Sequence, residues 1–263
     1  MGFSVTRNRT PLVVGNWKAN PPRADLDRLT SGLIQAVAAA AQAGVDVVVC
    51  PPFPWLATVA TGLNGSGIQL GAQTLAVVDS GGVTGEVPAS LLRGLCDYAL
   101  LGHYERRIQC EEDNGDIRKK IAAAIDNDIR PIFCVGESAE ALEHGANGGV
   151  LAEQMESVLD GLNLDSRLVI AYAPIWTTIG MIIPPNASYV NEVCAILRET
   201  LADITSPDLA QQARIIYGGR LTESNVNDLA AQPDIDGLLV GAGATSPDRF
   251  SMMAGAVVRA QAS

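Results

Sequence analysis

Residues 168–176 read Leu168-Val169-Ile170-Ala171-Tyr172-Ala173-Pro174-Ile175-Trp176. The apolar run predicts a buried strand, and the proline ends that strand and opens a loop that begins with a large aromatic side chain. A strand end that opens into a long loop is where a parallel barrel carries its chemistry. Ala173, at the tip of this strand, has only a methyl group, so the chemistry has to be sought at the ends of other strands.

Short apolar runs alternate with longer amphipathic stretches along the whole chain. The predicted strands are residues 12–16, 45–50, 68–72, 98–102, 130–135, 168–173, 213–217 and 237–240. The predicted helices are residues 25–43, 112–127, 151–159, 187–204, 224–231 and 248–260. Eight strands buried on both faces, each followed by a helix or crossover, predict an α/β fold: a single-domain (β/α)8 barrel over residues 11–261, behind a flexible N-terminus at residues 1–10.

A doubly wound open sheet is the alternative to the barrel. It would need a G-x-G-x-x-G turn after the first strand, and Gly15-Asn16-Trp17-Lys18 is no such turn. With 263 residues, 48% of them hydrophobic, the chain can bury a large core as one domain.

Composition excludes several classes of partner. The chain has 18 basic and 29 acidic residues, a formal charge of −11 and no basic cluster, which argues against nucleic acid. No apolar run approaches the ~20 residues that span a bilayer, so no membrane association is expected. Five cysteines scattered singly predict a reduced, cytoplasmic setting without a zinc site. No cofactor is implied, because the chain lacks a metal-ligand cluster and a dinucleotide fingerprint.

Charged side chains follow two of the predicted strands. Lys18 lies just past the first strand, where its charge can hold a phosphate or neutralise an oxyanion; a solvated loop lysine is the alternative. His103 follows the fourth strand, where a neutral imidazole can donate a hydrogen bond to a substrate carbonyl. Glu105 can pair with Lys18, while Arg106 and Arg107 are expected to form structural ion pairs.

Small residues follow the seventh and eighth strands, in Tyr217-Gly218-Gly219-Arg220 and Val240-Gly241-Ala242-Gly243. They let backbone N–H groups approach an anion, and the usual phosphate site of such barrels lies after these two strands. Two glycine-rich turns at the correct strand ends therefore predict an anion site.

Several motifs together resemble the triosephosphate isomerase family. They are Gly15-Asn16-Trp17-Lys18, Cys50-Pro51-Pro52-Phe53, Gly71-Ala72-Gln73, Thr84-Gly85-Glu86-Val87, Gly102-His103-x-Glu105-Arg106-Arg107, Cys134-Val135-Gly136-Glu137, Tyr217-Gly218-Gly219 and Asp236-Gly237-Leu238-Leu239-Val240-Gly241. They occur in order over nearly the whole chain, and the barrel fold follows from this resemblance more securely than from the strand count.

The resemblance implies a role for each matching residue. Asn16 and Lys18 would position and stabilise a small sugar-phosphate substrate, neutral His103 would polarise its carbonyl and enediolate oxygens, and Glu105 would support Lys18. These roles are carried over from the family, which is a known example of tuned acid–base chemistry. The remaining substrate-binding residues would be Gly180, Gly219, Arg220, Gly241 and Ala242. Thr84 would reach into the site of a neighbouring subunit, which implies a homodimer.

The chain departs from the family pattern at three places. Ala173 replaces the glutamate of A-Y-E-P-V-W, the general base of aldose–ketose isomerisation, which is typically worth ~10²–10⁴-fold in rate. The lid, close to W-A-I-G-T-G-K-T-A in the family, becomes apolar and proline-stiffened over residues 177–185, as if to seal a more hydrophobic ligand or to close differently. Tyr104 and Arg220 each replace a serine.

Three functional interpretations follow from these departures. The first is a repurposed isomerase-like enzyme that keeps Lys18 and His103 and moves protons through Tyr104, water or a substrate group; Tyr104 would need a strongly lowered pKa for this, since tyrosine ordinarily titrates near ~10. The second is a pseudoenzyme that binds a small ligand without turnover. The third is an ordinary glycolytic triosephosphate isomerase with engineered changes at its base and lid.

Overall fold

The computed structural model of this chain describes residues 9–179 and 184–261. Eight parallel strands close into a barrel in sequence order, and β1 pairs with β8 through Leu12 and Gly237. The strands are β1 Leu12–Asn16, β2 Asp46–Cys50, β3 Gln69–Ala72, β4 Tyr98–Leu101, β5 Arg130–Val135, β6 Val169–Tyr172, β7 Arg214–Tyr217 and β8 Gly237–Val240. All eight predicted strands are present, with bounds within one residue of the prediction, and the (β/α)8 fold is confirmed.

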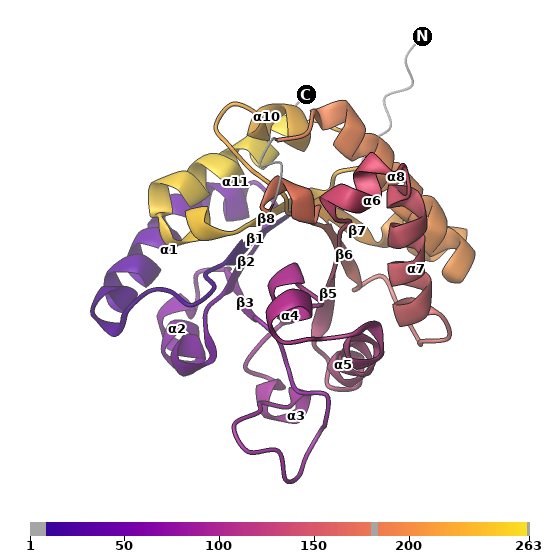
Figure 1. Cartoon of the computed structure of the whole chain (residues 1–263). Helices are drawn as coiled ribbons and strands as arrows, with labels where there is room; N and C mark the ends of the chain where they lie inside the picture. The colour runs from indigo at the N-terminus through magenta and orange to yellow at the C-terminus, as the bar shows by residue number, and fades with distance from the viewer. Residues whose placement is uncertain (1–8, 180–183, 262–263) are drawn as a thin grey trace.

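Helices surround the strands on the outside of the barrel (Figure 1). They are α1 Leu26–Gln42, α2 Leu56–Leu63, α3 Ala89–Leu92, α4 Tyr104–Gln109, α5 Asn114–Asp126, α6 Ala139–Glu143, α7 Asn147–Leu159, α8 Ala187–Ile204, α9 Pro207–Gln212, α10 Val226–Ala230 and α11 Pro247–Gln261. The six predicted helices are all present. The flexible N-terminus predicted for residues 1–10 lies almost entirely outside the described residues.

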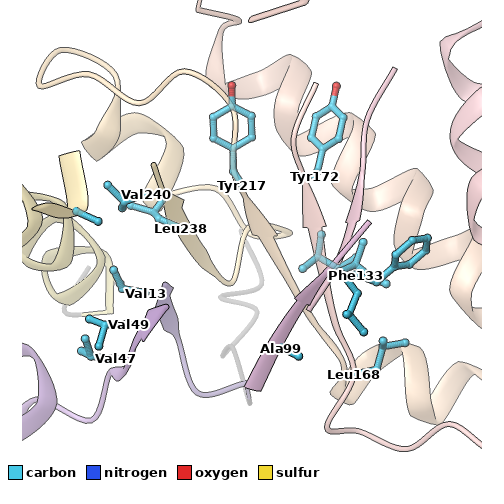
Figure 2. Packing of buried hydrophobic residues seen from close by; sticks show 14 of the residues in the cluster. Val13, Val47, Val49, Ala99, Phe133, Leu168, Tyr172, Tyr217, Leu238 and Val240 are labelled. Atoms are coloured by element: carbon cyan, nitrogen blue, oxygen red, sulfur yellow. The ribbon is translucent and has the colours of Figure 1, made fainter. Parts of the chain in front are cut away.

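The barrel wall separates two buried clusters because strand side chains alternate in direction. Leu12 and Val14 face the barrel interior, with neighbours such as Val48 and Ile132. Val13, between them, belongs to the layer between strands and helices, as do the neighbouring residues Val47 and Val49 in Figure 2. The strands read as continuous apolar runs because both of their faces are covered.

The N-terminal end of the barrel is closed by polar side chains. Arg214 donates to Asp46 at 2.7 Å, and Arg130 and Arg214 both donate to the Tyr98 hydroxyl at 2.9 Å. Polar contacts at this end of a barrel stabilise the fold, whereas the C-terminal strand ends carry the chemistry in barrels of this type. The site is therefore to be sought at the opposite end.

The backbone at the start of the loop after β6 is fixed by contacts with the end of β5. Ala173 donates its N–H to the Val135 carbonyl at 2.8 Å, and the backbone of β5 approaches so closely that a Cβ added to Gly136 would overlap the Ala173 carbonyl. The buried Glu137 carboxylate accepts from Tyr172 at 2.9 Å and from Trp176 at 2.8 Å. The start of the loop is thus fixed, although it carries no functional side chain at residue 173.

Candidate active site

The end of β1 places Lys18 over the mouth of the barrel. The buried Asn16 accepts the Lys18 N–H through Oδ1 at 2.9 Å, and Gln73 donates to the Lys18 carbonyl at 2.8 Å. Lys18 adopts φ of 53°, a left-handed conformation that costs a non-glycine residue about 1–3 kcal/mol. The surrounding hydrogen bonds hold this strained backbone, which aims the ammonium group at the site.

His103 precedes α4 and accepts a hydrogen bond from the Glu105 N–H through Nδ1 at 3.3 Å. In a neutral ring the proton must therefore be on Nε2. Burial lowers the pKa of His103 to about 4, with Lys18 acting in the same direction and Glu105 opposing both. The imidazole is uncharged at neutral pH, and its Nε2–H is a donor available to a ligand, in agreement with the role that the family resemblance implies.

Glu105 pairs with Lys18, as predicted from the sequence. Burial raises the pKa of this carboxyl, but the hydrogen bond from Lys18 and the nearby His103 outweigh burial and leave the pKa below its ordinary value. The carboxylate is ionised and fully engaged. Arg106 and Arg107 have structural partners, since Arg106 pairs with Glu112 and Arg107 donates to Gly102.

Tyr104 stacks beside His103, with 4.7 Å between the ring centroids. Its hydroxyl donates to Glu105 at 3.3 Å and makes a hydrogen bond with Thr178 in the loop after β6. Burial, together with the charge of Glu105, raises the pKa of Tyr104 to about 12. This direction is opposite to the one that base catalysis would need, so Tyr104 is a phenol and a donor at neutral pH.

Two cavities open at this end of the barrel. The first, here called the side cavity, has a volume of about 290 Å³ and lies between β1, β3 and α4, lined by Asn16, Lys18, Phe53, Gln73, His103 and Glu105 among others. The second, the mouth cavity, has a volume of about 360 Å³ and extends over the ends of β7 and β8. Asn16, Lys18 and His103 line both cavities, so they form one continuous site.

The mouth cavity brings together most of the residues predicted to bind substrate. Its lining includes Tyr104, Gly219, Arg220, Gly241 and Ala242. A Cβ added to Gly219 would overlap the Tyr217 hydroxyl, so only glycine fits at this point of the turn. The glycine-rich turns thus lie where the sequence predicted, beside the charged groups of β1 and β4.

Two predicted residues fall elsewhere. Thr84 lies exposed on the long loop between β3 and α3, which projects away from the barrel in Figure 1 and lines neither cavity. Gly180 lies outside the described residues, as does most of the tip of the predicted lid. Of that lid, the structure places Thr177 fully buried and Thr178 and Ile179 exposed.

Ala173 lies at the end of β6 and is buried. It lines a gap of about 10 Å³ that is also bounded by Tyr104 and Cys134. A gap of this size is at the lower limit for holding a single water molecule. The Cβ of Ala173 lies toward Gly218, where an added Cβ would be 3.4 Å from it, and Gly218 lines the mouth cavity. Tyr104 and Ala173 border the same gap, so two of the departures from the family pattern lie close together.

Arg249 and Thr178 line the mouth cavity. Thr178 belongs to the lid predicted over residues 177–185, whereas Arg249 was not predicted from the sequence. Arg249 is on the first turn of α11, directly after the loop that follows β8, and the rule that barrel sites lie beyond strand ends could have indicated it. Arg220 and Arg249 are both exposed, and neither guanidinium has a hydrogen bond, ion pair or ring contact with another of the described residues.

The described residues contain no group of three or more His, Cys, Asp or Glu side chains arranged to hold a metal ion. None of the helices within residues 9–179 and 184–261 is both long and apolar enough to cross a membrane.

Comparison with known proteins agrees with the fold. Residues 11–257 match the sequence profile of the family described as triosephosphate isomerase. Proteins named triosephosphate isomerase from Nocardia farcinica, Mycobacterium avium and Chromohalobacter salexigens are 37%, 38% and 40% identical to it. These matches cover 93%, 94% and 92% of this chain and 95%, 96% and 96% of the relatives. The chain belongs to the triosephosphate isomerase family.

Proposed function

We propose that this protein binds a small phosphorylated carbonyl compound in the mouth cavity and that its aldose–ketose isomerisation is strongly impaired. The impaired isomerisation is inferred from Ala173, which stands where the family pattern has the general base. The first part is supported by Lys18 and neutral His103, which line the cavity together with the glycine-rich turns after β7 and β8.

The retained groups supply the electrophilic half of an isomerisation. A substrate carbonyl oxygen placed between the Lys18 ammonium and His103 Nε2 would receive two donors, and the same donors would stabilise the negative charge that develops on that oxygen in an enediolate. Asn16, whose Oδ1 is occupied by the Lys18 N–H, keeps its amide nitrogen as a further donor.

Among the described residues, no side chain is placed and ionised so that it could replace the missing general base. A base must lie within hydrogen-bond reach of the carbon-bound proton and must be ionised at neutral pH. Glu105 is ionised but is bonded to Lys18 and Tyr104, and Tyr104 itself remains protonated. Loss of the base alone is expected to lower the rate by ~10²–10⁴-fold.

A working triosephosphate isomerase is the second candidate. The relatives favour it, because proteins of that name match this chain over more than nine-tenths of its length. Under this interpretation, water or a substrate group moves the proton. The two candidates differ in turnover by this chain as it stands and not in what they bind.

Steady-state isomerisation of glyceraldehyde 3-phosphate, measured as kcat/KM, separates the candidates. The panel comprises the unaltered protein, Ala173→Glu, Tyr104→Ser and the double variant Ala173→Glu/Tyr104→Ser. Because Tyr104 borders the same gap as Ala173 and replaces the serine of the family pattern, we expect the single Ala173→Glu variant to recover less activity than the double variant. The double variant should exceed the unaltered protein by ~10²–10⁴-fold, while Tyr104→Ser alone should stay near background.

The proposed impairment would be refuted by efficient turnover in the unaltered protein. In that case the isomerase interpretation holds, and Ala173→Glu should change kcat/KM by less than about tenfold. If all four proteins stay at background while glycerol 3-phosphate binds, the lid and Arg220 have changed which reaction the cavity supports, which favours the pseudoenzyme interpretation.

A further inference from the structure

A second group of polar side chains lies at the N-terminal end of the barrel, opposite the mouth cavity. It surrounds a cavity of about 350 Å³, here called the base cavity, whose lining residues lie at or just before the starts of β1, β2, β5, β6 and β7. Its charged lining residues are Arg9, Asp46, Arg130, Arg167 and Arg214. Four cations therefore share one carboxylate in this lining, and none of its described residues is apolar.

One of the four arginines lacks a carboxylate partner. The other three form ion pairs at 2.6–2.8 Å: Arg9 with Asp236, Arg167 with Asp165 and Arg214 with Asp46. Arg130 forms no ion pair with any of the described residues, and its one side-chain hydrogen bond goes from Nη1 to the Tyr98 hydroxyl at 2.9 Å. Asp46 and Asp97 attract its charge from farther than ion-pair distance. The Nε and Nη2 groups of Arg130 are therefore available to a ligand.

Tyr98 holds Arg130 close to Arg214. Its side chain is fully buried, and its hydroxyl accepts a hydrogen bond from each guanidinium group at 2.9 Å. The central carbons of the two guanidinium groups lie 5.2 and 5.9 Å from the centre of the Tyr98 ring. A hydroxyl accepts these hydrogen bonds but does not bring the negative charge of a carboxylate. Two like charges are thus held beside one ring with only Asp46 to offset them, which leaves a positive charge to be balanced.

The floor of the base cavity is buried, whereas its rim is exposed. Arg214 is 8% exposed and Arg130 is half-buried. The exposed rim residues are Thr10, Ser166, Gln211 and Gln212. Their side-chain hydroxyl and amide groups form no hydrogen bond with any of the described residues. A ligand that reaches the charged floor from solvent would therefore also meet neutral hydrogen-bond donors.

Arg167 lies beside Arg130, and both also line a neighbouring cavity of about 410 Å³, together with Asp97 and Asp128. Arg167 Nη1 is 3.7 Å from Asp128, which is longer than a hydrogen bond, so this nitrogen can donate to a ligand. Planar guanidinium groups can each donate two hydrogen bonds to the oxygens of a phosphate or a carboxylate. A phosphate group offers more oxygens than a carboxylate, so it can use the rim donors as well as both arginines.

We propose that the base cavity is a second anion site, which takes a phosphate group between Arg130 and Arg167. Its volume is within the range of about 300–1,000 Å³ that is usual for small-molecule sites, so a free phosphate or a small organic phosphate fits. The base cavity shares no lining residue with the mouth cavity. An anion bound here is therefore additional to the ligand of the proposed function, and it stabilises the folded barrel by mass action.

Titration with inorganic phosphate, followed by two-dimensional ¹H–¹⁵N NMR, tests this site. Sodium chloride at the same ionic strength is the reference. The backbone amides of Ser166 and Gln212 report on the base cavity, and those of Gly219 and Gly241 report on the mouth cavity. We expect saturable shifts at the base signals, with a dissociation constant of roughly 1–10 mM. Arg130→Gln should raise this constant at least about tenfold, which is the effect of losing one charge-assisted contact.

Further variants make the test specific. Arg167→Gln should weaken binding at the base signals by roughly 3- to 30-fold. Arg28→Gln is the matched control, because it removes the same charge from an exposed residue of α1 that lines neither cavity, and it should leave the dissociation constant unchanged. Arg220→Gln, in the mouth cavity, should also leave the base signals unchanged. If Arg130→Gln fails to fold, Arg130→Lys replaces it and should weaken binding about threefold or more, since lysine lacks the paired donors.

The outcomes distinguish this inference from the proposed function. Saturable base signals that persist in both Arg130→Gln and Arg167→Gln would overturn the assignment, as would shifts that sodium chloride reproduces. Shifts confined to the amides of Gly219 and Gly241 would also overturn it and would leave the proposed function standing. A parallel titration with glycerol 2-phosphate identifies the source of the phosphate group: tighter binding of this probe indicates an organic phosphate, tighter binding of inorganic phosphate indicates the free ion, and either order supports the site.

Discussion

At the scale of single residues, the site depends on groups whose ionisation is set by burial and by close neighbours. His103 stays neutral because its ring is buried beside α4, and Glu105 stays charged because Lys18 donates to it. Tyr104 stays protonated for the same reason that His103 stays neutral, since burial disfavours the charged form of each. The same surroundings therefore keep His103 and Tyr104 as neutral donors and keep Glu105 and Lys18 as an ion pair.

Unfolding at different pH values tests the state of His103. Its pKa is lowered to about 4 in the folded protein, so between pH 6.5 and 4 the unfolded chain binds more protons, and stability must fall as the pH falls through this range. From pH 6.5 to 5 we expect a loss of about 1–2 kcal/mol from this group. Urea unfolding of the protein and of His103→Gln measures it.

The difference in free energy of unfolding between these two proteins should shrink as the pH drops from 6.5 to 5. Glu105 has its pKa lowered below 4.5, so its contribution is lost only at lower pH and does not interfere in this window. A difference that stays constant from pH 7.5 to 5 would mean that His103 titrates normally in the folded protein.

At the scale of elements, the strands were predicted more accurately than the helices. Each strand is an uninterrupted apolar run buried on both faces, which gives a strong pattern even over four residues. The helices α2, α3, α4, α6 and α9 were not predicted, because none exceeds eight residues and two turns show little periodicity. The α4 helix matters most, since it carries Tyr104 and Glu105.

Three helix starts differ from prediction by two or more residues. The α5 helix begins at Asn114 and not at residue 112, because the Asp113 side chain caps it by accepting the Asp116 N–H. The α7 helix begins at Asn147 and not at Leu151, because Gly148 and Gly149, which are poor helix formers, hid its first turn in the sequence. The α10 helix begins at Val226 and not at residue 224. Asn225 instead accepts from the Thr222 N–H and donates to the Arg220 carbonyl, which shapes the loop beside the mouth cavity.

The close approach of β5 and β6 leads to a prediction about Gly136. A methyl group there would overlap the Ala173 carbonyl, so Gly136→Ala should destabilise the protein by more than about 2 kcal/mol and displace the loop after β6. Gly149→Ala is the matched control, because the exposed Gly149 has nothing within 4 Å of its added Cβ and lies in α7. It should be neutral or stabilising by up to about 1 kcal/mol.

Thermal and urea unfolding of the two glycine variants measures this difference. Equal stabilities would show that the strand ends can separate without cost, in which case residue 173 is held less firmly than its hydrogen bond to Val135 indicates.

At the scale of the whole molecule, the loop between β3 and α3 stands apart from the barrel (Figure 1). It carries Thr84 together with the exposed apolar residues Val78 and Val83, and α3 adds Leu91, which is 69% exposed. Several exposed apolar side chains on one projecting segment favour an interaction surface. With the family resemblance, this supports the proposal that the protein is a homodimer that uses this loop.

Sedimentation velocity tests the dimer. Val83→Asp places a charge on the loop and should shift the protein from the dimer to the monomer at micromolar concentration. Ile196→Asp is the control, because Ile196 is similarly exposed, at 45% against 44% for Val83, but lies on α8. A monomeric parent protein, or equal behaviour of both variants, would refute the proposed interface.

The sequence predicts which residues form the site more fully than it predicts how their side chains pack and pair. Lys18, His103 and Arg220 follow strands, and the barrel rule places all strand ends together. What the sequence could not give was the tyrosine ring beside Ala173 or the absence of partners for Arg220 and Arg249. Both depend on side-chain packing between loops that are far apart along the chain.

The left-handed backbone of Lys18 has an evolutionary consequence. Glycine would relieve its strain in one substitution, so a lineage that no longer used this cavity would gain stability by losing the lysine. This chain has the strained lysine although residue 173 is alanine. We infer that the use of the ammonium group at this cavity, and not the stability of the fold, accounts for a lysine at this position.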